Sequence, residues 1–311
     1  MSRRALPHAL GAAAGIALDQ LVPEPPAAIH PVALFGLAMT GLERRIHRDA
    51  RGAGLLHAFT GVALGVVAGR AVRSTALATV TAVAGRALAE TGTAIGRALE
   101  ADDLERARAM LPALVGREPD GLRASEIARA VVESVAENTV DAVVAPALWA
   151  AVAGAPGALS YRAVNTLDSM VGHRSARYAK YGWASARLDD ALAWVPARLT
   201  AALVALVRPR AARAVWVAVR TQAPRHPSPN AGVAEAAFAA ALGLRLGGTN
   251  RYGERTEQRP PLGTGRPAVV GDIEQAVRLC RDVRVALATG LVVFGAVVAG
   301  WRRPRRGIEG P

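Results

Sequence analysis

The feature that most constrains the fold is an apolar segment near the C-terminus. Residues 285–300 carry no charged side chain, follow Arg284, and are followed by Trp301, Arg302 and Arg303. An apolar run of about 17 residues is the lower limit for a helix that crosses a bilayer. Trp and Arg at the border of such a run are typical of the membrane interface, with the positive charge on the cytosolic side. The segment therefore predicts a transmembrane helix.

Other apolar segments are shorter, and several are rich in Ala and Gly, as close-packed membrane helices are. Each of them alone could also be a buried helix of a soluble bundle. Arg70 and Arg73 interrupt one segment, which is therefore either two short helices or one long kinked helix. The expected spans are residues 5–22, 55–88 (as 55–69 and 75–88), 140–159, 191–207 and 285–300.

Polar stretches separate these segments, and strand-like alternation is nearly absent. No internal repeat is visible, so we expect a single domain over residues 1–311. The predicted class is all-α: a multi-pass helical protein of the cell membrane whose polar helical loops carry the active site. Arginines near both termini favour an even number of spans. The number of spans and the topology stay open.

The charge balance limits the partners. The net charge is +13, and Lys180 is the only lysine. Such a surplus suits anionic lipid, a phosphorylated substrate or nucleic acid. Aromatic residues make up only 4% and do not alternate with basic ones, which argues against nucleic acid. Because Cys280 is the only cysteine, the chain has neither an internal disulfide nor a cysteine-based zinc site.

One predicted helix carries three acids on one face. Glu133, Glu137 and Asp141 are spaced four residues apart, and Asn138 lies beside them. Like charges at this spacing repel one another, so the arrangement favours a cation above that face. Carboxylate oxygens suit Mg²⁺. The alternative is a solvated helix face whose acids pair with arginines such as Arg129.

A second polar cluster occupies nine residues and offers an amide, two hydroxyls, a carboxylate and an imidazole. These groups could hold a metal or a phosphate, or they could form an Asx-type turn with ordinary capping. The cluster consists of Asn165, Thr166, Asp168, Ser169 and His173.

A third cluster combines acids and arginines. Asp189 and Asp190 suggest a metal, and Arg187 and Arg198 suggest phosphate. Helix capping by the two acids is the alternative. Near the N-terminus, His30 precedes a proline and is either a base or substrate ligand, or a structural residue. The chain has no P-loop, G-x-G-x-x-G, nucleophile elbow or H-E-x-x-H motif.

These clusters, in this order, resemble the CobD/CbiB family of adenosylcobinamide-phosphate synthases over almost the whole chain. Two stretches outside the five matching blocks depart from the family pattern. VGRE at 115–118 is similar to a family block but has Glu118 in place of Asp, and Pro23-Glu24-Pro25 stands where the family usually has Gly-Asp-Pro. The five matching blocks are HPV at 30–32, VVESVAENTVDAVVAP at 131–146, NTLDSMVGH at 165–173, RLDD with PAR at 187–198, and SPNAG at 228–232.

The resemblance implies the reaction. A carboxylate of adenosylcobyric acid is joined to aminopropanol or its O-phosphate, and ATP is hydrolysed. The partners would be a corrinoid, a small amine and membrane lipid, with a homo-oligomer left open. Phosphorylation turns a carboxylate into a good electrophile, and Mg²⁺ and arginines neutralise the phosphate charge.

The resemblance also suggests roles for the clusters, although the general base cannot be assigned. The catalytic candidates are Glu133, Glu137, Asp141 and Asp168. The candidates for binding Mg²⁺ are Glu137, Asp141, Asp168, Asp189 and Asp190. The candidates for binding ATP or substrate are His30, Arg117, Asn138, Asn165, Thr166, Ser169, Arg187 and Arg198.

Two other functions compete with this one. A non-catalytic membrane signalling protein like AmpE would keep the spans and lose the acids, which this chain retains. A transporter with intramembrane carboxylates is a further alternative. Transporters are commonly built from two similar halves, and the sequence shows none. We therefore favour the enzyme.

Overall fold

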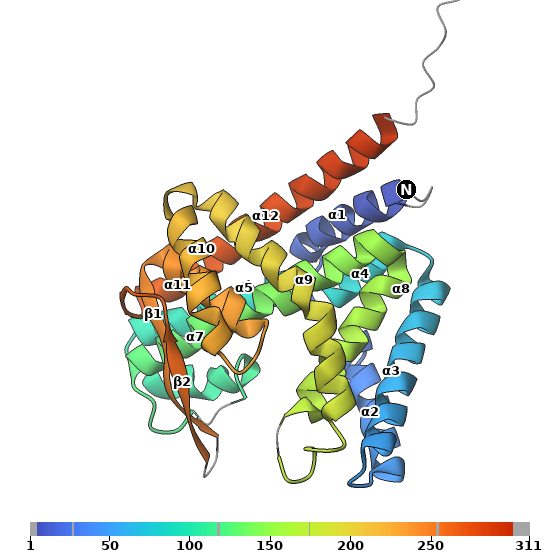
Figure 1. Ribbon diagram of the computed structural model, residues 1–311, viewed down its shortest axis with the longest axis horizontal. Helices are drawn as coiled ribbons and strands as arrows, with labels where there is room; N and C mark the ends of the chain where they lie inside the picture. The colour runs from blue at the N-terminus through green and yellow to red at the C-terminus, as the bar shows by residue number, and fades with distance from the viewer. Residues whose placement is uncertain (1–4, 27, 117–118, 174, 253–254, 301–311) are drawn as a thin grey trace, which may run out of the picture.

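The computed structural model describes residues 5–26, 28–116, 119–173, 175–252 and 255–300 (Figure 1). These residues are mostly helical, so the predicted all-α, multi-pass class is confirmed. The long helices are α1 (Ala5–Leu21), α2 (Pro31–Ile46), α3 (Arg51–Val72), α5 (Gly85–Glu100), α7 (Ala124–Thr139), α8 (Ala145–Leu167), α9 (Trp183–Val207) and α12 (Gly271–Gly300). The shorter helices are α4 (Thr75–Ala82), α6 (Leu104–Met110), α10 (Ala212–Thr221) and α11 (Ala231–Leu242).

Among the described residues, four helical stretches are long and apolar enough to cross a membrane. They are Arg51–Val72, Ala124–Gly172, Trp183–Val207 and Gly271–Ala299. The last contains most of the C-terminal span expected from the sequence, while Trp301 and the arginines after it lie outside the described residues.

The segment expected at 55–88 forms separate helices. Arg73 ends α3 in a left-handed conformation, with φ of 55°. Ser74 then caps α4, because its Oγ accepts a hydrogen bond from the backbone N of Leu77 at 3.2 Å. α4 has only eight residues and is too short to span a bilayer by itself.

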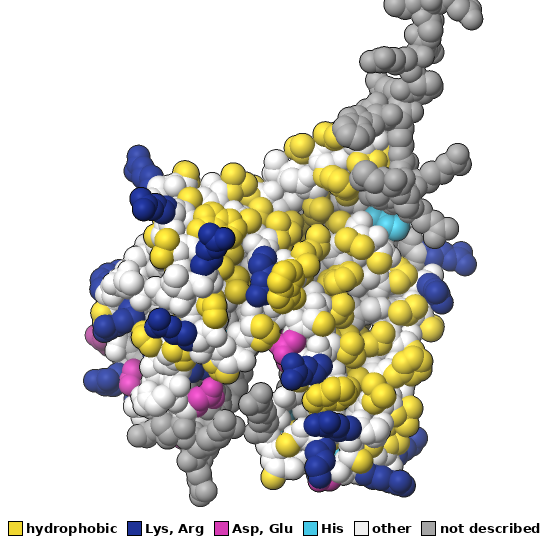
Figure 2. Space-filling model, viewed as in Figure 1, with side chains coloured by type: hydrophobic (Ala, Val, Ile, Leu, Met, Phe, Trp, Pro, Cys, Tyr) yellow, Lys and Arg dark blue, Asp and Glu magenta, His cyan; other side chains and the backbone are white. Residues whose placement is uncertain are grey.

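Exposed apolar side chains cover the outside of these helices. Leu55, Phe59 and Val67 on α3 are all more than half exposed, as are Trp194 and Val195 on α9. Figure 2 shows hydrophobic side chains spread over the side of the molecule where α3, α8 and α9 lie. A contiguous apolar surface of this kind is unfavourable in water and favourable against lipid. The surface therefore agrees with a membrane protein.

The interior is built around α7 and its continuation into α8. Along α7 nearly every aliphatic side chain is buried, including Ile127, Val131 and Val135. α12, α5 and α11 pack around α7, whereas α3 packs along α8. α1 and α12 lie side by side, and α1 also packs against α4 and α8 (Figure 1). The helix of the acid stripe thus runs through the centre of the molecule.

A small sheet lies on the opposite side of the molecule from α2 and α3 (Figure 1). It consists of β1 (Leu244–Tyr252) and β2 (Arg255–Leu262), which pair antiparallel, and the two-residue β3 (Arg266–Pro267), which pairs parallel with β1. A bulge between Leu246 and Gly248 interrupts the β1–β2 ladder. The sequence did not indicate this hairpin, because its buried apolar side chains, Leu244, Leu246 and Leu262, are few and lie near the strand ends, whereas strand prediction depends on sustained apolar alternation.

The four apolar stretches lead to a first prediction. We expect the chain to stay in the membrane pellet after an alkaline carbonate wash, because peripheral contacts are broken by that treatment and helices buried in lipid are not. The measurement is an immunoblot of pellet and supernatant. Release of the chain into the supernatant would contradict an integral membrane protein.

Candidate active site

A cavity of about 930 Å³ lies between α7, α9 and the loop before α11. One wall is acidic, and its carboxylates come from four different elements. The acidic residues lining the wall are Glu137, Asp141, Asp168, Asp189 and Asp190. A second part of the lining consists of His226, Ser228, Asn230, Glu257 and Arg259. We call this space the acid cavity. Segments far apart in the sequence thus contribute to one site.

Two of the acids lie on π-helical turns. Asp141 belongs to the π-turn Val140–Val144 between α7 and α8, and Asp168 begins the π-turn Asp168–Gly172 at the end of α8. A π-turn holds an extra residue, changes the direction of the side chains that follow, and is frequent at functional sites. Gly172 closes the second turn, and any Cβ there would collide with the carboxylate of Asp168.

Hydrogen bonds connect the acids to α8. Asn165 Nδ2 donates to Asp189 Oδ1 at 3.3 Å, and Tyr161 OH donates to Asp141 Oδ1 at 3.4 Å. Asp189 is only 9% exposed. Asp141 lies within the electrostatic reach of Asp189 and Glu137. Several like charges at such short range repel one another unless a cation or hydrogen-bond donors balance them.

The second part of the lining is organised by the turn before α11. Ser228 N donates to His226 Nδ1 at 3.1 Å, and Ser228 Oγ accepts from the backbone N of Asn230 and of Ala231. Asn230 Nδ2 donates to the carbonyl oxygen of Asp190 at 2.8 Å, which joins the turn to α9. Burial lowers the pKa of His226, so its imidazole is neutral at neutral pH.

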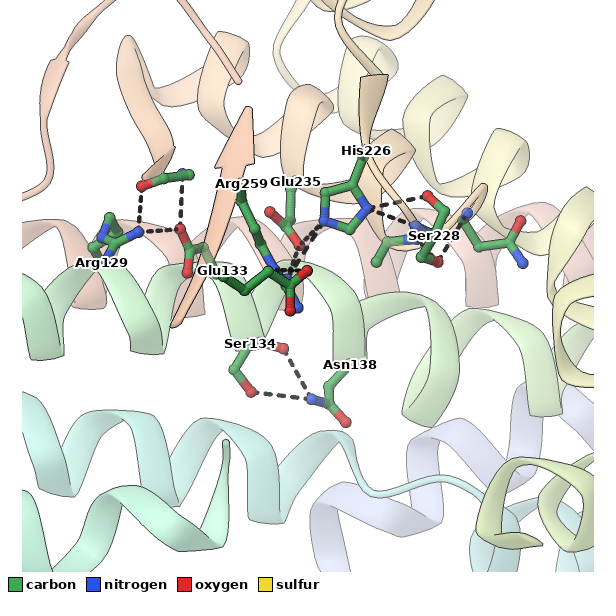
Figure 3. Close-up of polar contacts among 12 residues, drawn as sticks. Arg129, Glu133, Ser134, Asn138, His226, Ser228, Glu235 and Arg259 are labelled. Atoms are coloured by element: carbon green, nitrogen blue, oxygen red, sulfur yellow. Dashed lines mark hydrogen bonds and ion pairs between the residues drawn. The ribbon is translucent and has the colours of Figure 1, made fainter. Parts of the chain in front are cut away.

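Arg259 is the only arginine among the described residues that line the cavity. It extends from β2, and its Nη1 lies 3.4 Å from His226 Nε2 and 3.7 Å from Glu235 Oε1 (Figure 3). The Arg259 side chain is 20% exposed. A mostly buried guanidinium facing a group of carboxylates gives the cavity one cationic position, suited to a phosphate or carboxylate of a ligand.

The loop between the second π-turn and α9 forms a further part of the wall through His173 and Ser175. This loop is tied to α2, because Arg177 Nη2 and Tyr178 OH both donate to Glu43 Oε1 at 2.9 Å. Burial would raise the pKa of Glu43, but these hydrogen bonds and the charge of Arg177 hold it below its ordinary value. The loop is therefore anchored by an ionised carboxylate.

Two candidates on α7 do not line the acid cavity. Glu133 forms an ion pair with Arg129, at 3.4 Å, and accepts a hydrogen bond from the backbone N of Gly247 at 2.9 Å. Asn138 Nδ2 donates to the carbonyl oxygen and Oγ of Ser134. Figure 3 shows Ser134 and Asn138 on the side of α7 away from the hairpin.

The remaining candidate residues differ in whether they line the acid cavity. Ser169 lines it, and Arg187 is exposed and does not. Arg198 stacks over the ring of Trp194 and donates to Asn230 Oδ1 at 3.0 Å, so it touches the cavity wall indirectly. Arg117 lies outside the described residues.

His30 and Thr166 line a different cavity. This second space has a volume of about 840 Å³ and a mostly apolar lining that includes Leu37 and Met170. His30 Nδ1 accepts a hydrogen bond from Val32 N at 3.2 Å and so caps α2. The structure therefore places these two residues beside α2 and away from the acidic wall.

The donor set of the acid cavity fits a hard cation, since all six acids that line it, Glu257 included, offer carboxylate oxygens. Among the described residues, no three His, Cys, Asp or Glu side chains converge closely enough to hold a metal ion by themselves. Mg²⁺ is usually held by one or two carboxylates, with waters and substrate phosphates as its other ligands. The cavity therefore fits Mg²⁺ that is shared with a phosphorylated ligand.

Sequence reasoning missed His226, Glu257 and Arg259. His226 stands two residues before the SPNAG block at 228–232, and this neighbourhood was the one available signal. Glu257 and Arg259 lie in a polar strand without apolar alternation. Nothing local distinguishes them from solvent-exposed charges.

Known proteins resemble the chain along most of its length. Residues 12–280 match the sequence model described as CobD/Cbib protein. A protein of Mycobacterium tuberculosis named cobalamin biosynthesis protein CobD is 47% identical, over 96% of this chain and 97% of its own length. Proteins of the same name from Rhodobacter capsulatus and Halalkalibacterium halodurans are 44% and 35% identical, over 70% and 94% of this chain and 69% and 98% of their own lengths.

No solved structure matches the chain. The sequence matches nevertheless cover the acid stripe on α7, the 165–173 cluster, the 187–198 cluster and the turn before α11. On this breadth of similarity, the chain belongs to the CobD/CbiB family of cobalamin biosynthesis proteins.

Proposed function

We propose that the chain joins a carboxylate of adenosylcobyric acid to aminopropanol, or to its O-phosphate, in an ATP-dependent amide ligation. The observation that carries the proposal is the acid cavity, which is lined by six acidic residues together with Arg259. Oxygen ligands for a cation, opposite a guanidinium, suit a site that handles phosphate. Family membership supplies the corrinoid as the substrate class.

The chemistry balances in two steps. A carboxylate oxygen of the corrinoid attacks the γ-phosphorus of ATP, the bond to the β–γ bridging oxygen breaks, and ADP leaves. The amine nitrogen then attacks the acyl carbon of the resulting acyl phosphate, and inorganic phosphate leaves as the amide forms. The amine loses its proton to a base.

The residues divide between these tasks. Bound Mg²⁺ would supply charge neutralisation at the phosphates, and one or two of Asp141, Asp168 and Asp189 would hold it. Arg259 would bind a phosphate and orient it. A carboxylate of the acidic wall that does not hold Mg²⁺ would accept the proton from the amine.

The competing function, a non-catalytic membrane signalling protein like AmpE, has no use for this arrangement. Six acids gathered in one cavity cost electrostatic free energy, and a protein without a ligand there gains nothing from them. Their retention and their gathering in one cavity with Arg259 both favour the enzyme.

This proposal predicts a specific turnover. Protein purified in detergent should release ADP only when ATP, Mg²⁺, the corrinoid and an amine are all present, with one amide formed per ADP. The measurement is a coupled ADP assay together with mass spectrometry of the corrinoid. ADP release that is independent of the corrinoid, or the absence of any amide product, would contradict the ligase function.

A further inference from the structure

The hairpin reaches the acid cavity through only two of its described residues, Glu257 and Arg259. Both are on β2, and the strand pairing sets their position: Arg259 is opposite Gly248, and Glu257 is opposite Asn250. Adjacent residues of a strand point to opposite faces, so a shift of one residue would turn Arg259 away from the cavity. Whatever fixes β1 therefore fixes the cationic group of the site.

Two side chains of α7 hold β1 by its backbone. Arg129 Nη1 donates to the carbonyl oxygen of Gly247, and its Nη2 donates to that of Thr249 at 2.9 Å. One turn further along α7, Glu133 Oε1 accepts from the backbone N of Gly247 at 2.9 Å. Both side chains are mostly buried, at 14% and 8% exposed, and pair with each other at 3.4 Å (Figure 3).

The bulge in β1 is shaped for this contact. Gly247 and Gly248 have φ of 85° and 100°, a region that favours glycine. A Cβ on Gly247 would collide with the carbonyl oxygen of Pro260, and one on Gly248 would lie 3.5 Å from Arg129 Nη1. The two glycines thus bring the strand against the guanidinium and leave both backbone groups of Gly247 facing α7.

We propose that Arg129 and Glu133 are positioning residues, an α7 latch that fixes the β1–β2 hairpin in the register that puts Arg259 into the acid cavity. Glu133 belongs to the same acid stripe as Glu137 and Asp141, but it does not line the cavity, and its oxygen is used by Gly247 N. The latch itself depends only on these contacts. Its effect on substrate binding rests on the proposed function.

The test compares Glu133→Gln with Glu133→Ala in the full-length protein in detergent. Glutamine keeps an oxygen that can accept from Gly247 N, whereas alanine leaves that N–H and the Arg129 charge without their partner. We expect amide hydrogen exchange across residues 244–262 to accelerate roughly tenfold or more in Glu133→Ala and in Arg129→Ala, and to stay close to wild type in Glu133→Gln. The matched control is Arg123→Ala, which removes an exposed ion pair with Glu126 on the same helix.

Kinetics supply a second readout. Loss of the latch should raise the KM for ATP roughly tenfold, with a smaller change in kcat, because it displaces Arg259 without removing any group that reacts. If Glu133→Gln is as inactive as Glu133→Ala while hairpin exchange is unchanged, Glu133 is catalytic and the latch is wrong. Unchanged exchange in both alanine variants would also overturn it. If the wild type shows no ligation, the ligase proposal is wrong, but the hydrogen-exchange measurement still tests whether Arg129 and Glu133 hold the hairpin. The failure of one proposal can therefore be told from the failure of the other.

Discussion

Asp189→Asn is expected to reduce turnover by on the order of 10³-fold, the loss typical of removing one group that stabilises charge in a transition state. Asp189 lies on the acidic wall, and its side chain is almost wholly buried. Asparagine has the same shape and can still accept from Asn165 Nδ2, which donates to Asp189 Oδ1 at 3.3 Å. The substitution therefore removes the charge and leaves the packing in place.

The measurement is kcat for corrinoid-dependent ADP release, together with a melting curve in detergent. Asp282→Asn is the matched control, since Asp282 pairs with Arg208 at 2.8 Å and does not line the acid cavity. We expect that variant to keep at least half of the wild-type kcat. An Asp189→Asn enzyme with near wild-type turnover would remove Asp189 from the catalytic machinery. If kcat fell only together with folding, the acidic wall would be structural.

Most of the acidic residues that line the cavity could be predicted from the sequence, but the point along α7 at which the cavity ends could not. Helical spacing placed Glu133, Glu137 and Asp141 on one face, and the last two do line the cavity. Spacing alone does not tell where a cavity ends along a helix. Glu133 lies one turn outside it because a strand more than 100 residues later in the sequence occupies its oxygen.

The hairpin shows why other parts of the site could not be predicted. Its pairing partner, Arg129, is distant in sequence, and the strands carry charged or polar residues on both faces, such as Glu257, Gln258 and Arg259. Leu244, Leu246 and Leu262 are buried, but the rest of the two strands carries too few apolar residues for an alternating pattern, so the local sequence gives little signal. Its position follows from the α7 latch, a long-range contact that only the folded chain contains.

The C-terminal span shows the opposite case. An uncharged run from 285 to 300 has few structures available to it, and the structure forms α12 there. The helix begins earlier, at Gly271, because Asp272 in its first turn accepts from the backbone N of Val269 at 2.8 Å and pairs with Arg266. The first turns of the helix carry charged residues, so in sequence they resemble the polar stretch before the span. Apolar length predicts a span well and a helix boundary poorly.

The packing of α3 on α8 yields the second large effect. α3 carries buried Gly61, Gly65 and Gly69 at four-residue spacing, the small-residue pattern that lets two membrane helices approach closely. A Cβ on Gly69 would collide with the backbone of Ala155 and Pro156, and one on Gly65 would lie 2.9 Å from the carbonyl oxygen of Leu159. Backbone atoms cannot rotate away as a side chain can, so the helices must separate.

We therefore expect Gly69→Ala to lower the free energy of unfolding by about 1–3 kcal/mol, the usual cost of overpacking a close contact. Gly290→Ala is the matched control, because Gly290 lies within a candidate span and a Cβ there meets no atom within 4 Å. That change should be neutral, or stabilising by up to about 1 kcal/mol through helix propensity. The measurement is reversible unfolding of both variants in the same detergent.

The packing effect should also reach the acid cavity. α8 carries Asn165 and leads directly into the π-turn of Asp168, so separating α8 from α3 moves two groups of the site. Gly69→Ala should then lower kcat as well as stability, whereas Gly290→Ala should lower neither. Equal melting temperatures for Gly69→Ala and Gly290→Ala would mean that α3 and α8 do not touch as closely as the structure has them. Without that contact, a substitution at Gly69 would have no structural connection to the acidic residues of the cavity.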